Sequence, residues 1–103
     1  MRDLATLTVE DFAPTVGDLY RVTAGPEGRY AEALEVRLAA AEGRGTAPAP
    51  LRDPFALLFE GPPATVLAQG TYLLAHATLG ELTIFLVPVG RTDEATRYEA
   101  IFA

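Results

Sequence analysis

The chain of 103 residues contains no cysteine and no tryptophan, and it also lacks lysine, serine and asparagine. Without cysteine there is no disulfide framework and no thiolate metal site. Without serine or cysteine the commonest catalytic nucleophiles are missing, and without lysine there is neither a P-loop nor Schiff-base chemistry. The single histidine, His76, does not make a histidine-rich metal site by itself. We therefore expect no enzymatic activity, no metal and no cofactor.

Positive charge is scarce as well. All eight basic residues are arginines, and fourteen acidic residues bring the formal net charge to −6. The arginines are scattered along the chain and no two are adjacent. A surface that binds nucleic acid or an anionic membrane instead gathers positive charge to neutralise phosphates. We therefore expect no nucleic-acid partner and no membrane partner.

Long hydrophobic runs are absent from the sequence. The longest, over residues 82–89, is interrupted by Thr83 and contains Pro88, whereas about 18 apolar residues are needed to span a bilayer. The N-terminus has no secretory hydrophobic segment. Hydrophobic residues make up 50% of the chain and charged residues 21%, as is typical of folded proteins. These features predict a single domain over residues 1–103 with a cytoplasmic location.

The first element that the sequence predicts is a short helical turn near the N-terminus. Thr8 is a candidate N-cap, and two acidic residues follow it, where they complement the positive end of a helix. Phe12 is expected to close one end of the hydrophobic core. Pro14 and Gly17 are expected to end the turn quickly.

Alternating apolar residues predict strands over most of the remaining chain. Residues 30–41 favour a helix by composition, but the alternation of Leu34, Val36 and Leu38 fits a half-buried strand, which is the interpretation we prefer. Residues 42–50 are expected to form a loop. The other predicted strands span residues 18–23, 54–60, 71–77, 81–89 and 96–102. About six antiparallel strands at this spacing predict an all-β fold, either a small, partly open barrel or a sandwich.

The predicted strand at residues 81–89 is apolar on both faces. Leu82 and Ile84 alternate with Phe85 and Val87. A strand in a small antiparallel domain usually has one solvated face, so two apolar faces predict further cover. That cover would come from a second layer of the same domain, from a homo-oligomer or from another protein. The leading interpretation is therefore a non-enzymatic interaction module with these four residues as its candidate interface.

Two other interpretations remain open. Tyr72, His76 and Tyr98 combine apolar bodies with polar tips and could line a small-molecule site inside a barrel, although barrels of this size are generally filled by side chains. His76 could also act as a general base or a single metal ligand, but the interpretation we prefer for it is a structural hydrogen bond to a turn or a carboxylate.

Carboxylates are the remaining candidates for catalysis. Glu60, Glu81 and Glu99 could lie on neighbouring strands and form an acid–base pair. Their spacing selects no pair, however. They fit equally well as outward-facing charges with cross-strand arginine partners such as Arg97 or Arg52.

Several short motifs occur along the chain in a characteristic order: Phe12-Ala-Pro, Gly17, Phe55–Pro62, Gln69–Tyr72, His76, Leu79-Gly80, Phe85–Gly90 and Tyr98–Phe102. Together they resemble a family of small bacterial domains of unknown function, about as long as this chain and often encoded near phage-tail-collar-like proteins. The resemblance covers essentially the whole chain. It implies a structural role in a phage-tail-like assembly, and it brings no catalytic residues with it.

Overall fold

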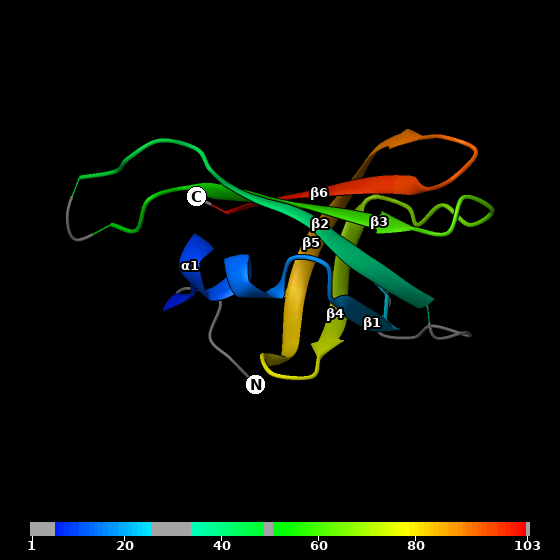
Figure 1. The fold of residues 1–103 in the computed structure, drawn as a ribbon, viewed down its shortest axis with the longest axis horizontal. Helices are drawn as coiled ribbons and strands as arrows, with labels where there is room; N and C mark the ends of the chain where they lie inside the picture. The colour runs from blue at the N-terminus through cyan, green and yellow to red at the C-terminus, as the bar shows by residue number, and fades with distance from the viewer. Residues whose placement is uncertain (1–5, 26–33, 49–50, 103) are drawn as a thin grey trace.

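Six strands form within the described residues of this protein, and apolar and polar side chains alternate along them (Figure 1). The structure, a computed structural model, describes residues 6–25, 34–48 and 51–102. The strands are β1 (Leu19–Ala24), β2 (Leu34–Gly43), β3 (Phe55–Gly61), β4 (Gly70–His76), β5 (Gly80–Arg91) and β6 (Thr96–Phe102). The predicted all-β fold is thus confirmed. The strand preferred for residues 30–41 is present from Leu34, while residues 30–33 lie outside the described residues.

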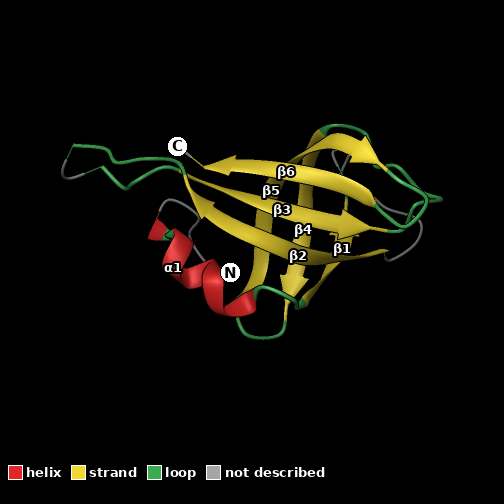
Figure 2. Ribbon diagram, turned by 45° about the horizontal axis from the view of Figure 1, so that its top comes forward, coloured by secondary structure: helices red, strands yellow, loops and turns green. Residues whose placement is uncertain are grey.

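The six strands form a closed barrel in the order β1-β2-β3-β6-β5-β4, and β4 pairs back with β1 (Figure 2). Every neighbouring pair is antiparallel. Because β4 lies beside β1 after three consecutively paired strands, the chain follows a Greek-key path. Of the two predicted arrangements the structure has the barrel, and its ring of strands is closed rather than partly open.

Large side chains fill the interior of the barrel. A ring of this size is just wide enough for side chains to occupy its inside. The largest fully buried side chains come from every strand and from the N-terminal helix: Tyr20, Tyr98, Phe12, Phe55, Phe59, Leu38, Leu57, Leu74, Leu82, Ile84, Leu86 and Val22. The hydrophobic core therefore lies inside the ring, and the charged residues of the strands point outward.

A short helix, α1 (Val9–Phe12), precedes β1. The Thr8 backbone N–H donates to the Asp11 carboxylate at 2.8 Å, which is one half of a capping box and fixes where the helix begins. Pro14 does not end the turn as predicted, because proline is tolerated in a first turn and a 3₁₀ turn, η2 (Ala13–Thr15), continues the helix. Gly17, at φ +97°, then redirects the chain into β1.

Phe12 closes one end of the barrel, as the sequence predicted. Its ring is fully buried, and its centroid lies 5.7 Å from that of Phe55 and 5.8 Å from that of Phe102. The Arg52 guanidinium lies 5.5 and 5.6 Å from the centroids of these two strand residues and donates to the Leu7 carbonyl at 2.7 Å. Stacked rings under a hydrogen-bonded guanidinium thus seal this end. The loop expected at residues 42–50 starts only after Gly43, because β2 extends to that residue.

Tyr98 fastens the opposite end. The segment from residue 62 to residue 69 crosses that end to connect β3 with β4. The Tyr98 hydroxyl accepts from the Leu67 N–H at 2.9 Å and donates to the Thr65 carbonyl at 3.3 Å, and Thr96 donates to the Pro62 carbonyl at 3.1 Å. These bonds satisfy buried polar groups and hold the crossing segment over the core.

Within the described ranges, 6–25, 34–48 and 51–102, no helix has the length and apolar character required to cross a membrane.

Gly61 provides a test of packing at the Tyr98 end. A Cβ at this position would lie 3.1 Å from Val36 Cγ1 and 3.3 Å from Tyr98 Cε2, whereas a Cβ at Gly43 would meet nothing within 4 Å. We expect Gly61→Ala to lower the free energy of unfolding by about 1–3 kcal/mol through overpacking. The control Gly43→Ala should change it by less than about 0.5 kcal/mol. Urea unfolding of both variants measures the difference, and equal stabilities would contradict the packing described.

Candidate functional site

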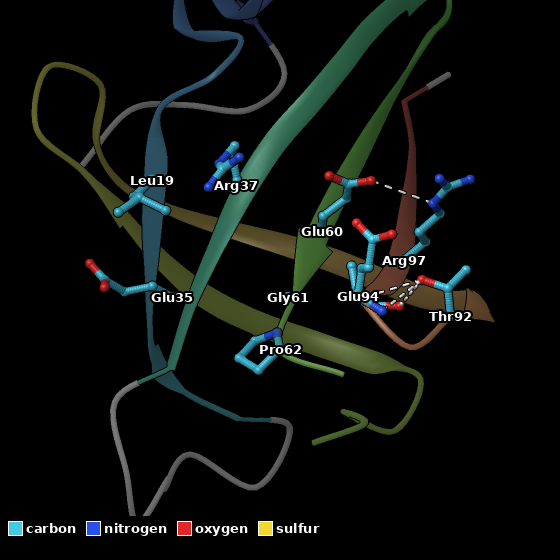
Figure 3. A pocket seen from close by; sticks show the side chains of 10 residues that line it. Leu19, Glu35, Arg37, Glu60, Gly61, Pro62, Thr92, Glu94 and Arg97 are labelled. Carbon is cyan, nitrogen blue, oxygen red and sulfur yellow. Dashed lines mark hydrogen bonds and ion pairs between the residues drawn. The ribbon is translucent and has the colours of Figure 1, made fainter. Parts of the chain in front are cut away.

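The outer wall of the barrel carries a groove of about 480 Å³. It lies over β1, β2, β3 and the start of β6, and the turn at residues 92–95 forms one rim (Figure 3). Charged side chains dominate its walls: Glu35, Arg37, Glu60, Glu94 and Arg97, with Leu19, Gly61, Pro62, Thr92 and Ala95 between them. The groove thus lies on the outside of a barrel whose interior is filled by side chains.

Strand register places the groove's charges in a row. Arg37 on β2 is the partner of Glu60 on β3, and Glu60 is the partner of Arg97 on β6. Arg97 Nε lies 3.4 Å from Glu60 Oε2, and both side chains are partly exposed. Arg37 forms no ion pair or hydrogen bond with the part of the chain that the structure describes. The guanidinium of Arg37 is therefore accessible to a carboxylate from outside the chain. The exposed Glu60–Arg97 ion pair contributes at most about 1 kcal/mol to stability.

His76 is used structurally, as the preferred interpretation of this residue anticipated. Its Nδ1 accepts from the backbone N–H groups of Thr78 and Leu79, both at 3.1 Å. The neutral ring therefore carries its proton on Nε2, which lies 2.9 Å from the Asp18 carboxylate. With both ring nitrogens engaged and the side chain 2% exposed, His76 fixes the β4–β5 turn and the start of β1.

Tyr20 is buried beside His76. Its hydroxyl lies 2.7 Å from Thr15 Oγ1, and its ring centroid is 4.6 Å from that of His76. Burial raises the pKa of the Tyr20 hydroxyl above its ordinary 10.0; the hydrogen bond with Thr15 opposes this rise and the charge of Asp18 adds to it. The neutral phenol is thus the form that the fold accommodates.

The four predicted interface residues divide between the two faces of β5. Leu82 and Ile84 are buried in the core, so their assignment to an interface is wrong. Phe85 is 49% exposed, and Val87 is half-buried on the same outer face. The exposed Ile101 of β6, which the sequence analysis did not single out, is another outward-facing hydrophobic residue.

The three predicted ligand-lining residues do not form one site. The Tyr72 hydroxyl donates to the Ala68 carbonyl at 2.6 Å, so it holds the crossing segment together with Tyr98. His76 lies at the other end of β4, where it binds the turn. Two of the three polar tips thus serve the crossing segment and the third serves the β4–β5 turn, because a buried hydroxyl or imidazole needs a partner.

The candidate catalytic carboxylates are outward-facing charges. Glu60 pairs with Arg97, as the alternative interpretation expected, and Glu99 lies 3.2 Å from Arg44. Glu81 is exposed on β5. In the described part of the chain, no cluster of three or more histidine or acidic residues is arranged to hold a metal ion.

A family model described as Domain of unknown function (DUF6916) matches residues 7–102. The chain belongs to this family. The match supports the resemblance to a family of domains of unknown function, and it carries no activity with it. No curated protein and no solved structure is significantly similar to the chain.

The groove of this DUF6916 domain was missed by the sequence analysis. Arg37 and Glu60 lie far apart in the sequence, and they become neighbours through the register of β2 and β3. That register changes at an irregularity between Leu38 and Ala40. A one-residue slip moves every side chain to the other face, so sequence alternation alone could not place these two charges side by side.

The structural role of His76 gives one testable prediction. His76→Phe removes the acceptor of the Thr78 and Leu79 N–H groups, and leaving buried donors unpaired costs about 1–3 kcal/mol. We expect that loss in the free energy of unfolding, measured with urea. Asp18→Asn, which keeps a side-chain oxygen near Nε2, should be much milder. A stable His76→Phe variant would show that these bonds do not hold the turn.

The raised pKa of Tyr20 gives another prediction. The folded state keeps the Tyr20 proton more tightly than the unfolded state does, so titration of this group leaves the free energy of unfolding unchanged well below pH 10.0, where both states are protonated. As the pH rises past that value, the unfolded state ionises first and the free energy of unfolding falls. Urea unfolding on both sides of pH 10.0 should show a smaller alkaline loss for Tyr20→Phe than for the original chain. Equal losses would contradict the role of burial.

Proposed function

We propose that this DUF6916 domain is a non-enzymatic protein-interaction module that makes its contacts on the outer face of β5 and β6. The observation that carries the proposal is the exposure of Phe85 (49%) and Ile101 (60%) on the outside of the barrel. Large apolar side chains that leave water on association provide much of the driving force for protein–protein binding. Val87, half-buried on the same face, adds to the apolar surface.

The arrangement of polar side chains supports a non-enzymatic role. His76 has both ring nitrogens bonded within the domain, so it has no free nitrogen for proton transfer. Glu60 and Glu99 are each paired with an arginine on the outer surface. A catalytic carboxylate pair instead needs one group with a raised pKa, which burial usually provides.

The alternative function, small-molecule binding inside the barrel, finds less support. The inside is occupied by buried residues from all six strands, and Tyr72 and Tyr98 use their hydroxyls to hold the crossing segment. The partner under our proposal is a second copy of the chain or another protein. A phage-tail-like assembly, which the sequence resemblance implies, is one setting for such a module.

A charge substitution on the outer face tests the proposal. Phe85→Glu should abolish association, because a carboxylate would have to be buried in the contact, and the monomer should stay folded. Leu19→Glu is the matched control: Leu19 is also 49% exposed but lies on β1. Light scattering on the size-exclusion peak, over a wide concentration range, measures self-association. Association that survives Phe85→Glu, or unfolding of the monomer by that change, would contradict the proposed surface.

A further inference from the structure

One ladder of the closed barrel is shorter than the strands that form it. β5 pairs with β4 along Gly80–Leu86, but it pairs with β6 only along Val87–Arg91. Beyond Glu99, β6 continues along β3 to Phe102. Figure 1 shows β5 and β6 diverging from the region where they pair. In the described part of the chain, Gly80–Leu86 therefore has a strand ladder on its β4 side alone.

This unpaired edge carries an exposed hydrophobic residue, and a second one lies on the diverging strand β6. Phe85 lies on the edge segment itself, and Ile101 lies on β6 beyond the last β5–β6 pair. A strand edge with unsatisfied N–H and C=O groups is a template for pairing with another strand. Proteins usually protect such an edge with charges or proline, and here Glu81 is the single charged residue of the segment.

We propose that this edge of β5 binds the same edge of a second copy of the chain, as an antiparallel pair about a twofold axis. The inference rests on the proposed function and specifies its partner and its binding mode. The two barrels would share a continuous sheet through backbone hydrogen bonds, with Phe85 of each copy losing solvent exposure. Pairing of this kind is an established way for a sheet edge to gain a strand.

The residues of the edge favour a second copy because they are complementary to themselves. The unpaired segment Gly80–Leu86 has Thr83 at its midpoint, so the longest overlap places Thr83 opposite Thr83. Glu81 of each copy then faces Phe85 of the other, and no two acidic residues of the segment are opposed. Threonine pairs are favourable across strands, whereas like charges directly opposite are unfavourable. A twofold contact must be self-complementary in this way. The segment meets this condition although the chain as a whole has a net charge of −6.

The absence of cysteine from the chain makes a direct test possible. Thr83→Cys would place two thiols across the twofold axis, where directly opposed residues have Cα atoms about 4.5–5.5 Å apart, within reach of a disulfide. Thr71→Cys is the matched control, because Thr71 is an exposed threonine of the neighbouring strand and pairs with Phe85. Both variants are first shown by thermal unfolding under reducing conditions to keep the fold, and they are then oxidised at a concentration where the original chain associates.

We expect Thr83→Cys to form a covalent dimer at least about tenfold faster than Thr71→Cys, because only the first places its thiols within disulfide distance. A mixture of Glu81→Cys and Phe85→Cys should cross-link faster than either variant alone. If the chain associates but the two threonine variants cross-link at equal rates, the strand pairing is wrong while the proposed interaction surface stands. A chain that stays monomeric at every concentration overturns this inference and leaves the proposed function with a foreign partner. Association that is unchanged by Phe85→Glu overturns the proposed function itself.

Discussion

The filling of the barrel by side chains is the constraint on which the rest of this structure depends. Tyr20, Phe59 and Tyr98 are fully buried inside a ring of six strands, and such a ring has little room beyond its own side chains. A partner of this domain would therefore bind on the outer wall or at the ends. The outer wall offers a charged groove over β1–β3 and an apolar surface around Phe85 on β5.

The polar tips of the buried aromatic residues hold the Greek-key path in place. Tyr98 binds the segment that crosses from β3 to β4, and Tyr72 binds the same segment close to its end. At the other end of β4, His76 binds the turn into β5 and the Asp18 carboxylate. The aromatic residues that the sequence suggested as a binding site thus act as hydrogen-bond partners of buried backbone groups.

Much of the fold could be predicted because alternation and turn residues are local signals. All six strands, the Thr8 cap and the burial of Phe12 follow from them. The inward face of β5 could not be predicted, because Leu82 and Phe85 are both apolar and period-2 alternation does not choose between them. The groove could not be predicted either, because it depends on the register of β2 and β3, which brings distant residues such as Arg37 and Glu60 side by side.

The central proposal is that this domain binds a second copy of itself through the outer surface of β5. Backbone amide hydrogen exchange, measured residue by residue at low and high protein concentration, tests that claim most directly. The account predicts that amides within Gly80–Leu86 gain protection as concentration rises, while those of β3, which is paired on both sides, keep theirs unchanged. Protection that is independent of concentration along β5, or that increases instead around the groove at Arg37, would contradict it.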